Sequence, residues 1–250
     1  MLMVCGSFAG AATFEEARRA GRILEADRRW SEAAAVYEAA LRDLPTTAPA
    51  ARRFWLVMSV AEVWFEARDY SAARRWLTRA VPVDDVERAR LLNASGTLRL
   101  VEGNLSGAAR ELARAVELSP GGDARAGALH NLAAVEMHTG RTREAIKHEE
   151  EALELWRVQL GGRHPYVLKA WVGLSSAHAL AGDWQAAAKS LEEALRIEET
   201  PEALANYAVV LEKLKRANEA AAVRRRVNPV ESTLPLLIDV QSRSAPIRTR

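Results

Sequence analysis

The stretch that decides the fold is WVGLSSAHALAGDWQAAAKSLEEAL, residues 171–195. Apolar and small residues recur at helical spacing on both sides of the dipeptide Gly182-Asp183. Glycine and aspartate at such a point are typical of a tight turn between two helices. The stretch therefore predicts a pair of helices that fold back on each other.

The same pattern occurs six times along the 250-residue chain. The second helix of each copy carries an alanine in its first turn, and these alanines lie 40, 35, 37, 42 and 33 residues apart. They are Ala33, Ala73, Ala108, Ala145, Ala187 and Ala220. Twelve positions before them stand Gly21, Ala61, Gly96, Ala133, Ser175 and Ala208. A period of this length indicates a repeat protein.

Small residues at these positions have a physical reason. Two antiparallel helices approach closely only where small side chains face each other. The pattern predicts second helices at residues 31–44, 71–81, 106–118, 143–155, 184–197 and 218–227. No hairpin of this kind can bury both of its faces alone, so we expect an all-α fold in which neighbouring hairpins stack.

The residues Trp171, Leu174, Gly182-Asp183-Trp184 and Leu191, with the alanines, closely resemble the tetratricopeptide repeat family. The likeness covers about residues 14–234 and implies a right-handed α-solenoid of about six antiparallel helix-turn-helix repeats. The repeats would be residues 14–53, 54–88, 89–125, 126–167, 168–200 and 201–234. The sequence departs from the family at Glu149 and Arg224, where an aromatic or apolar residue is preferred. The longer fourth repeat, with its segment 160–165, resembles the extended repeats of kinesin light chains.

Both ends of the chain differ in composition from the repeats. We expect residues 1–13 to be a flexible N-terminus, since the start lacks the basic region of a signal peptide. Residues 235–250 form a C-terminal tail that we expect to be partly disordered. Its apolar beginning, Leu234–Val240, is predicted to cover the last hairpin or to fold back into the groove.

In the tetratricopeptide family the first helices of the hairpins line a concave groove. Transferring the family's groove positions to this sequence predicts a partner-binding surface. The main candidates are Trp55, Met58, Phe65, Asn93, His130, Asn131, Met137 and Lys169. The same positions include Glu62, Arg90, Thr97, Leu100, Ala134, His138, Val172, Ser176 and Leu180. Aromatic residues and methionine in such a groove suit a partner helix or an extended peptide.

Two alternatives bear on this surface. Trp55 and Met137 either contact a ligand or pack between repeats, and a phase error of one residue would place them in the core. Some family members clamp a C-terminal carboxylate with lysine, arginine and asparagine residues. Only Asn131 and Lys169 match that arrangement here, which argues against such a clamp.

The bulk composition limits the classes of partner. A net charge of +2 gives no strong basic field, so nucleic-acid binding is not expected. No apolar run approaches the length of a membrane span, so no membrane association is expected either. The single cysteine, Cys5, permits no disulfide within the chain and fits a reducing, cytoplasmic location.

Catalytic and metal-binding motifs are not found. His130 and His138 are two helical turns apart, too far to share one metal ion directly. A metal site between His138 and His178 on neighbouring helices is the weaker alternative. Residues Glu149 to Glu151 are predicted to form a solvated helix face. We expect no catalysis, no metal and no cofactor.

The sequence therefore predicts a protein–protein interaction scaffold or adaptor that binds a peptide or helix in its groove. The alternative is a sensor domain, in which a small peptide or signal molecule fills the groove and changes its curvature. The architecture specifies a surface and leaves the partner open.

Overall fold

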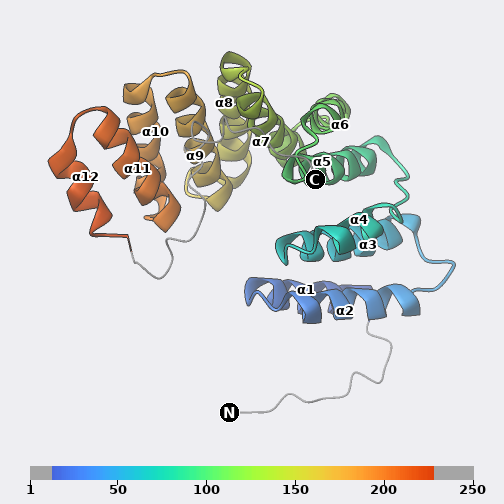
Figure 1. The fold of residues 1–250 in the computed structure, drawn as a ribbon. Coiled ribbons are helices and arrows are strands. Elements are labelled where there is room, and N and C mark those ends of the chain that lie inside the picture. The colour runs from blue at the N-terminus through green and yellow to red at the C-terminus, as the bar shows by residue number, and fades with distance from the viewer. Residues whose placement is uncertain (1–12, 228–250) are drawn as a thin grey trace, which may run out of the picture. The chain divides into compact units, whose positions relative to one another are not determined.

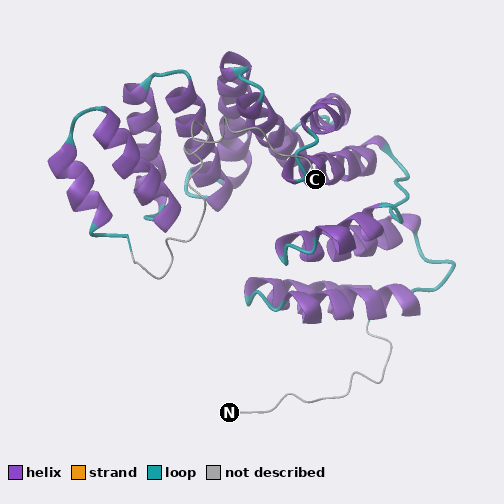
Figure 2. Ribbon diagram, in the orientation of Figure 1, coloured by secondary structure: helices purple, strands orange, loops and turns teal. Residues whose placement is uncertain are grey.

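The computed structural model describes residues 13–227, which contain twelve α-helices and no strand (Figures 1 and 2). The prediction of an all-α fold of helical hairpins is confirmed. Residues 1–12 and 228–250 lie outside the described part, and with them most of the predicted N-terminus, the end of the sixth repeat and the C-terminal tail. The chain divides into two compact units, residues 1–103 and 104–250, here called unit 1 and unit 2.

Unit 1 contains the first two hairpins and the first helix of the third. Its helices are α1 (Phe14–Ala26), α2 (Trp30–Asp43), α3 (Ala50–Glu66), α4 (Tyr70–Leu77) and α5 (Asp85–Val101). Helix α4 ends at Leu77, four residues before the predicted end at Val81. The reason is Pro82, which lacks an N–H and disfavours a helical conformation at Val81.

Unit 2 contains the second helix of the third hairpin and three complete hairpins. Its helices are α6 (Leu105–Leu118), α7 (Gly122–His138), α8 (Thr142–Leu160), α9 (Pro165–Leu180), α10 (Trp184–Ile197), α11 (Pro201–Lys213) and α12 (Ala217–Arg224). At 19 residues α8 exceeds its predicted length and ends at Gly161, where φ is 87°. This extension agrees with the lengthened fourth repeat that the sequence indicates.

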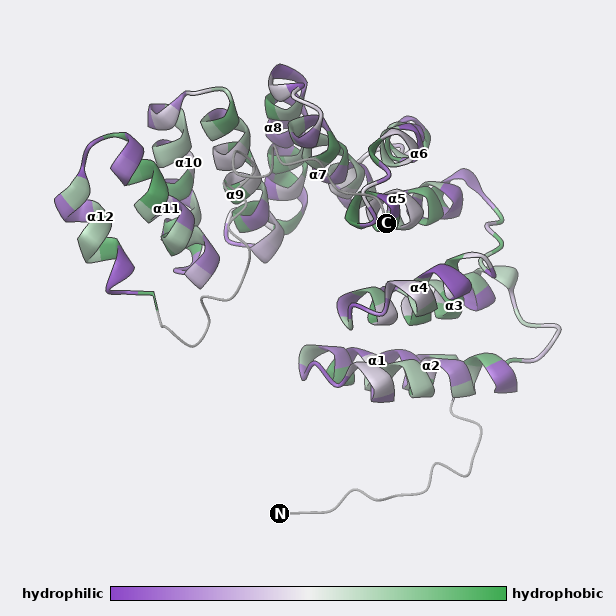
Figure 3. Cartoon of the chain, viewed as in Figure 1, coloured by the Kyte–Doolittle hydropathy of each residue, from purple (hydrophilic) through white to green (hydrophobic). Residues whose placement is uncertain are grey.

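The alanines that define the repeat are among the most deeply buried positions of the hairpins. All six, from Ala33 to Ala220, are at most 1% exposed. The small residues twelve positions earlier are buried as well. Figure 3 shows hydrophobic and hydrophilic residues alternating along the helices, as expected when one side of each helix packs against its neighbours.

The turn inside each hairpin has one backbone conformation. Its residue five positions before the repeat alanine has a positive φ in all six hairpins. Three of these residues are glycines, Gly103, Gly140 and Gly182, and three are not: Arg28, Arg68 and Lys215. In the second, third and fifth hairpins the residue directly after it is an aspartate or asparagine: Asp69, Asn104 or Asp183. The side chain of this residue accepts a hydrogen bond from the backbone N–H three residues further on. The turn is therefore set by packing of the two helices even where the sequence lacks glycine.

Tyr37 and Gly21 show how tightly a hairpin closes. The ring of Tyr37 on α2 is fully buried over α1, and its hydroxyl donates a hydrogen bond of 2.5 Å to Glu25 Oε1. A Cβ atom at Gly21 would lie 2.2 Å from Tyr37 Cζ. Glycine is therefore required at this point of α1 by the ring of its partner helix.

We expect Gly21→Ala to lower the stability of unit 1 by about 1–3 kcal/mol, because the ring of Tyr37 must move to admit a methyl group. The control is Gly127→Ala in α7, where an added Cβ meets no atom within 4 Å and alanine favours helix by up to about 1 kcal/mol. Thermal unfolding followed by circular dichroism compares them. Equal melting temperatures for the two variants would show that Gly21 is not tightly enclosed.

Candidate functional site

In unit 1, side chains at the predicted positions of α3 and α5 meet on one face. Arg90 on α5 donates hydrogen bonds of 2.8 Å from Nη2 to both carboxylate oxygens of Glu62 on α3. Both residues belong to the predicted groove set and lie on successive first helices. Their ion pair joins two residues of the predicted set across α3 and α5.

The aromatic candidates of this face are half-buried. The ring of Trp55 makes edge contacts with Phe14 and Tyr37, with ring centroids 5.4 and 5.5 Å apart. Phe65 lies 5.4 Å from the ring of Tyr70. Met58, by contrast, is 0% exposed and packs in the core of unit 1, so it offers no accessible surface. Trp55 and Phe65 thus combine a packing role with partial exposure.

Asn93 and Thr97 continue the same face on α5. Both side chains are half-buried, and the Thr97 hydroxyl donates a hydrogen bond of 2.8 Å to the carbonyl of Asn93. The hydroxyl proton of Thr97 is therefore already donated within α5. Asn93 is the member of the pair whose amide group suits recognition of a peptide backbone.

In unit 2 the candidates lie on α7 and α9. His130, Asn131 and Met137 on α7 are half-buried, and Lys169 on α9 is exposed. Val172 and Ser176, also in the predicted set, are buried, and the Ser176 hydroxyl donates to the carbonyl of Val172. The accessible part of the predicted surface in unit 2 is therefore mainly polar.

Glu202 on α11 adds a carboxyl group to this face. Burial raises its pKa above the ordinary value of a glutamate, while the nearby positive charges of Lys169 and His130 act in the opposite direction. Three successive first helices, α7, α9 and α11, thus place ionisable groups near one another. Glu202 was not among the predicted residues, although it stands 18 positions before Ala220, as Lys169 does before Ala187.

The prediction that Glu149 lies on a solvated helix face is wrong. Glu149 is 0% exposed, and its Oε2 lies 3.0 Å from Nδ1 of His130 on α7. Its neighbours Glu150 and Glu151 are exposed, as predicted. Adjacent residues of a helix point in different directions, and Glu149 occupies the position four residues after Ala145 that is buried in four of the other five repeats. A Cβ at Gly173 of α9 would lie 2.3 Å from Glu149 Oε1, so this carboxyl group needs glycine beside it.

A second histidine–glutamate pair joins the same two helices with the roles exchanged. Nδ1 of His148 on α8 lies 2.7 Å from Oε2 of Glu136 on α7, and Glu136 is 3% exposed. The hairpin of α7 and α8 is therefore held by two histidine–glutamate pairs whose carboxyl groups are buried. Sequence reasoning missed both, since the histidine and the carboxylate of each pair are 19 and 12 residues apart.

The remaining chemical predictions concern metals and membranes. His138 is exposed at the end of α7. Within residues 13–227 no three histidine, cysteine, aspartate or glutamate side chains are grouped so that they could hold a metal ion. Over the same residues, none of the helices combines the length and the apolar character that a bilayer span requires.

The sequence matches known family models in two places. Two models described as tetratricopeptide repeat match residues 18–89 and residues 124–200. Together with the six hairpins and their buried alanines, these matches show that the chain belongs to the tetratricopeptide repeat family. The comparison with curated proteins gave no match.

Solved structures share the fold at low sequence identity. A chain of the APC/C hetero-tetramer Cut9-Hcn1 aligns with a TM-score of 0.75 and 17% identity over 95% of this chain, which spans 44% of that chain's length. BtubC (BKLC) from P. vanneervenii gives a TM-score of 0.60 and 18% identity, over 95% of this chain and 94% of its own. TPR-like repeats of a putative kinesin light chain from Podosopora anserina give a TM-score of 0.54 and 19% identity. The alignment covers 74% of this chain and 94% of that chain. At these identities the likeness establishes the architecture alone.

We expect His130→Ala to lower the free energy of unfolding by about 3 kcal/mol, because it leaves the buried carboxyl group of Glu149 without its partner. In the double variant His130→Ala/Glu149→Leu much of this loss should be recovered, since no carboxyl group then remains to be buried. Chemical denaturation provides the measurement.

The matched control is His138→Ala on the same helix, which should change stability by less than about 0.5 kcal/mol because His138 is exposed. Equal effects of the two single variants, or a double variant no better than His130→Ala, would contradict the pairing.

Proposed function

We propose that the protein is a non-catalytic scaffold that binds a peptide or helix of a partner protein on the face formed by its first helices. One observation carries this proposal: ionisable side chains on successive first helices meet on one face. Glu62 and Arg90 do so in unit 1, and His130, Lys169 and Glu202 in unit 2. A row of this kind offers donors and acceptors at the spacing of the helices, which suits an elongated ligand.

The composition of the face in unit 2 supports a peptide as the ligand. Lys169 is exposed and makes no hydrogen bond or ion pair with another described residue. Asn131 and Met137 on α7 of the same unit are partly accessible, one with an amide group and the other with a flexible apolar side chain. Backbone groups of a peptide would meet the polar residues, and its apolar side chains would meet Met137.

We expect Lys169→Glu to reduce recovery of the partner by about tenfold, because the change places a second negative charge beside Glu202 on the binding face. Tagged full-length protein is used to recover partners from a lysate of the native cells, followed by quantitative mass spectrometry. A bound partner identified with the wild type is then titrated against both proteins.

Lys147→Glu is the matched control, since Lys147 is an exposed lysine on the second helix α8 of the same unit. Its charge change is identical, and both variants should melt at the wild-type temperature. Equal partner binding by wild type and Lys169→Glu would place the interaction elsewhere. An equal loss in both variants would mean that net charge, and not this face, controls binding.

A further inference from the structure

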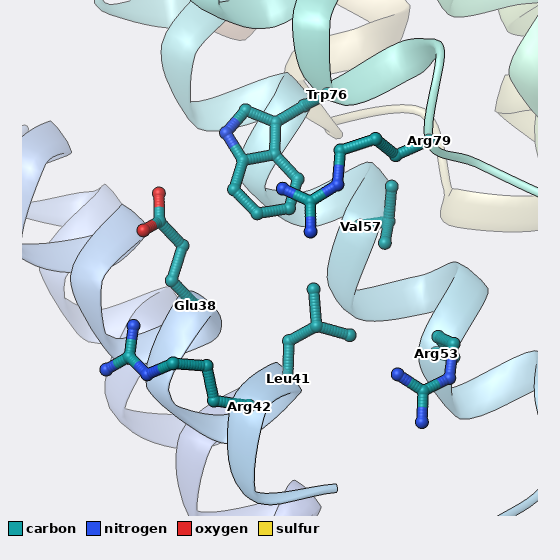
Figure 4. Close-up of a pocket in the computed structure, with 7 residues that line it drawn as sticks. All are labelled: Glu38, Leu41, Arg42, Arg53, Val57, Trp76 and Arg79. Carbon is teal, nitrogen blue, oxygen red and sulfur yellow. The ribbon is translucent and has the colours of Figure 1, made fainter. Parts of the chain in front are cut away.

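Unit 1 has a pocket on the side of its second helices. It lies between α2 and α4 over α3 and has a volume of about 380 Å³. Its floor is apolar: Leu41 and Val57 are buried at 8% and 4% exposure, and the indole of Trp76 forms a half-buried wall. Figure 4 shows these three side chains surrounded by charged groups from α2, α3 and the end of α4.

The charged groups around this floor are mostly arginines. Arg42, Arg53 and Arg79 are exposed and surround the pocket, with Glu38 as its single carboxylate. The guanidinium of Arg79 lies over the ring of Trp76, 3.9 Å from the centroid, as Figure 4 also shows. None of the three arginines forms an ion pair with a carboxylate among residues 13–227. Other arginines of unit 1, such as Arg29 and Arg88, pair with acidic side chains on their own helices.

Unpaired guanidinium groups beside an apolar floor favour one kind of ligand. Arginine binds carboxylates with two parallel hydrogen bonds, and a guanidinium resting on an aromatic ring keeps its donors free for this. The floor needs an apolar side chain to cover it, and that requirement disfavours a purely ionic ligand. Beyond the pocket the chain continues into Val81 and Val83, which are 74% and 55% exposed, so the apolar surface extends past Arg79.

An equivalent pocket in unit 2 provides an internal comparison. It lies between α8 and α10 over α9, with a volume of about 440 Å³, and Leu153 and Trp171 occupy the repeat positions of Leu41 and Val57. Its charges differ, however, because Glu150 and Glu154 line it and Arg157 is paired with Glu154 at 3.0 Å. The repeat thus makes the pocket in both units, while arginines without an ion pair line only the pocket of unit 1.

We propose that the pocket of unit 1 binds an acidic segment of a partner protein, in which an apolar side chain enters between Leu41, Val57 and Trp76 while flanking carboxylates pair with Arg42 and Arg79. A protein segment fits better than a nucleic acid, because the pocket has an apolar floor and a carboxylate and the chain carries a net charge of only +2. This surface is separate from the first-helix face, so the two proposals stand or fall independently.

The test uses the full chain and two short fluorescein-labelled peptides, one in which glutamate alternates with leucine and one in which glutamine replaces every glutamate. Fluorescence anisotropy measures binding at low and at physiological salt. We expect the glutamate peptide to bind at least about tenfold more tightly than the glutamine peptide, with affinity falling as salt rises. Arg42→Glu/Arg79→Glu should weaken the glutamate peptide by about tenfold or more, because like charges then face each other.

The matched control is Arg110→Glu/Arg143→Glu, which reverses two exposed arginines on second helices of unit 2 and should change affinity by less than about twofold. Arg42→Lys/Arg79→Lys should retain part of the binding, and circular dichroism confirms that each variant is folded. Lys169→Glu should leave this binding unchanged, which separates it from the first-helix face.

Three results would overturn the proposal: no measurable binding of the glutamate peptide, equal binding of the glutamine peptide, or equal binding by Arg42→Glu/Arg79→Glu and wild type. Displacement of the glutamate peptide by a single-stranded DNA oligonucleotide at lower concentration than by unlabelled peptide would also overturn it, in favour of a nucleic-acid site.

Discussion

The contact on which this structure depends is the one between an alanine of each second helix and a small residue of the first helix beside it. Six alanines at this position are almost completely buried, from Ala33 in unit 1 to Ala220 in unit 2. Alanine itself buries little apolar area, so it stabilises the hairpin mainly by allowing the two helices to lie close together. Two helices that approach closely bring their larger residues, such as Tyr37 and Leu191, into full contact.

This contact also decides which side chains are left for other molecules. Once the alanine side of a second helix faces inward, residues such as Arg42 turn outward, and the first helices present positions such as Arg90 and Lys169 on another face. Two surfaces with different chemistry result from one packing rule. The first-helix face carries mixed charges and amide groups, and the pocket of unit 1 combines an apolar floor with unpaired arginines. Both proposed binding surfaces follow from the hairpin geometry.

The fold could be predicted from the sequence because its signal is local and repeated: Ala187 has an equivalent in every hairpin, and the turn glycine Gly182 recurs in three of the six. The candidate site could be predicted only in part. Met58 was assigned to the groove but is buried, and Glu149 was assigned to solvent but is buried against His130 and Gly173. Both depend on which neighbours a side chain meets across helices, and a helical period alone does not specify those neighbours.

The most direct measurement compares Ala33→Leu with Ala35→Leu, two identical changes on α2, one at a fully buried alanine and one at an exposed alanine. If close approach at the repeat alanine holds the hairpins together, Ala33→Leu should lower the melting temperature markedly, since overpacking a filled core costs about 1–3 kcal/mol. Ala35→Leu should leave the melting temperature unchanged. Equal melting temperatures for the two variants would contradict the account.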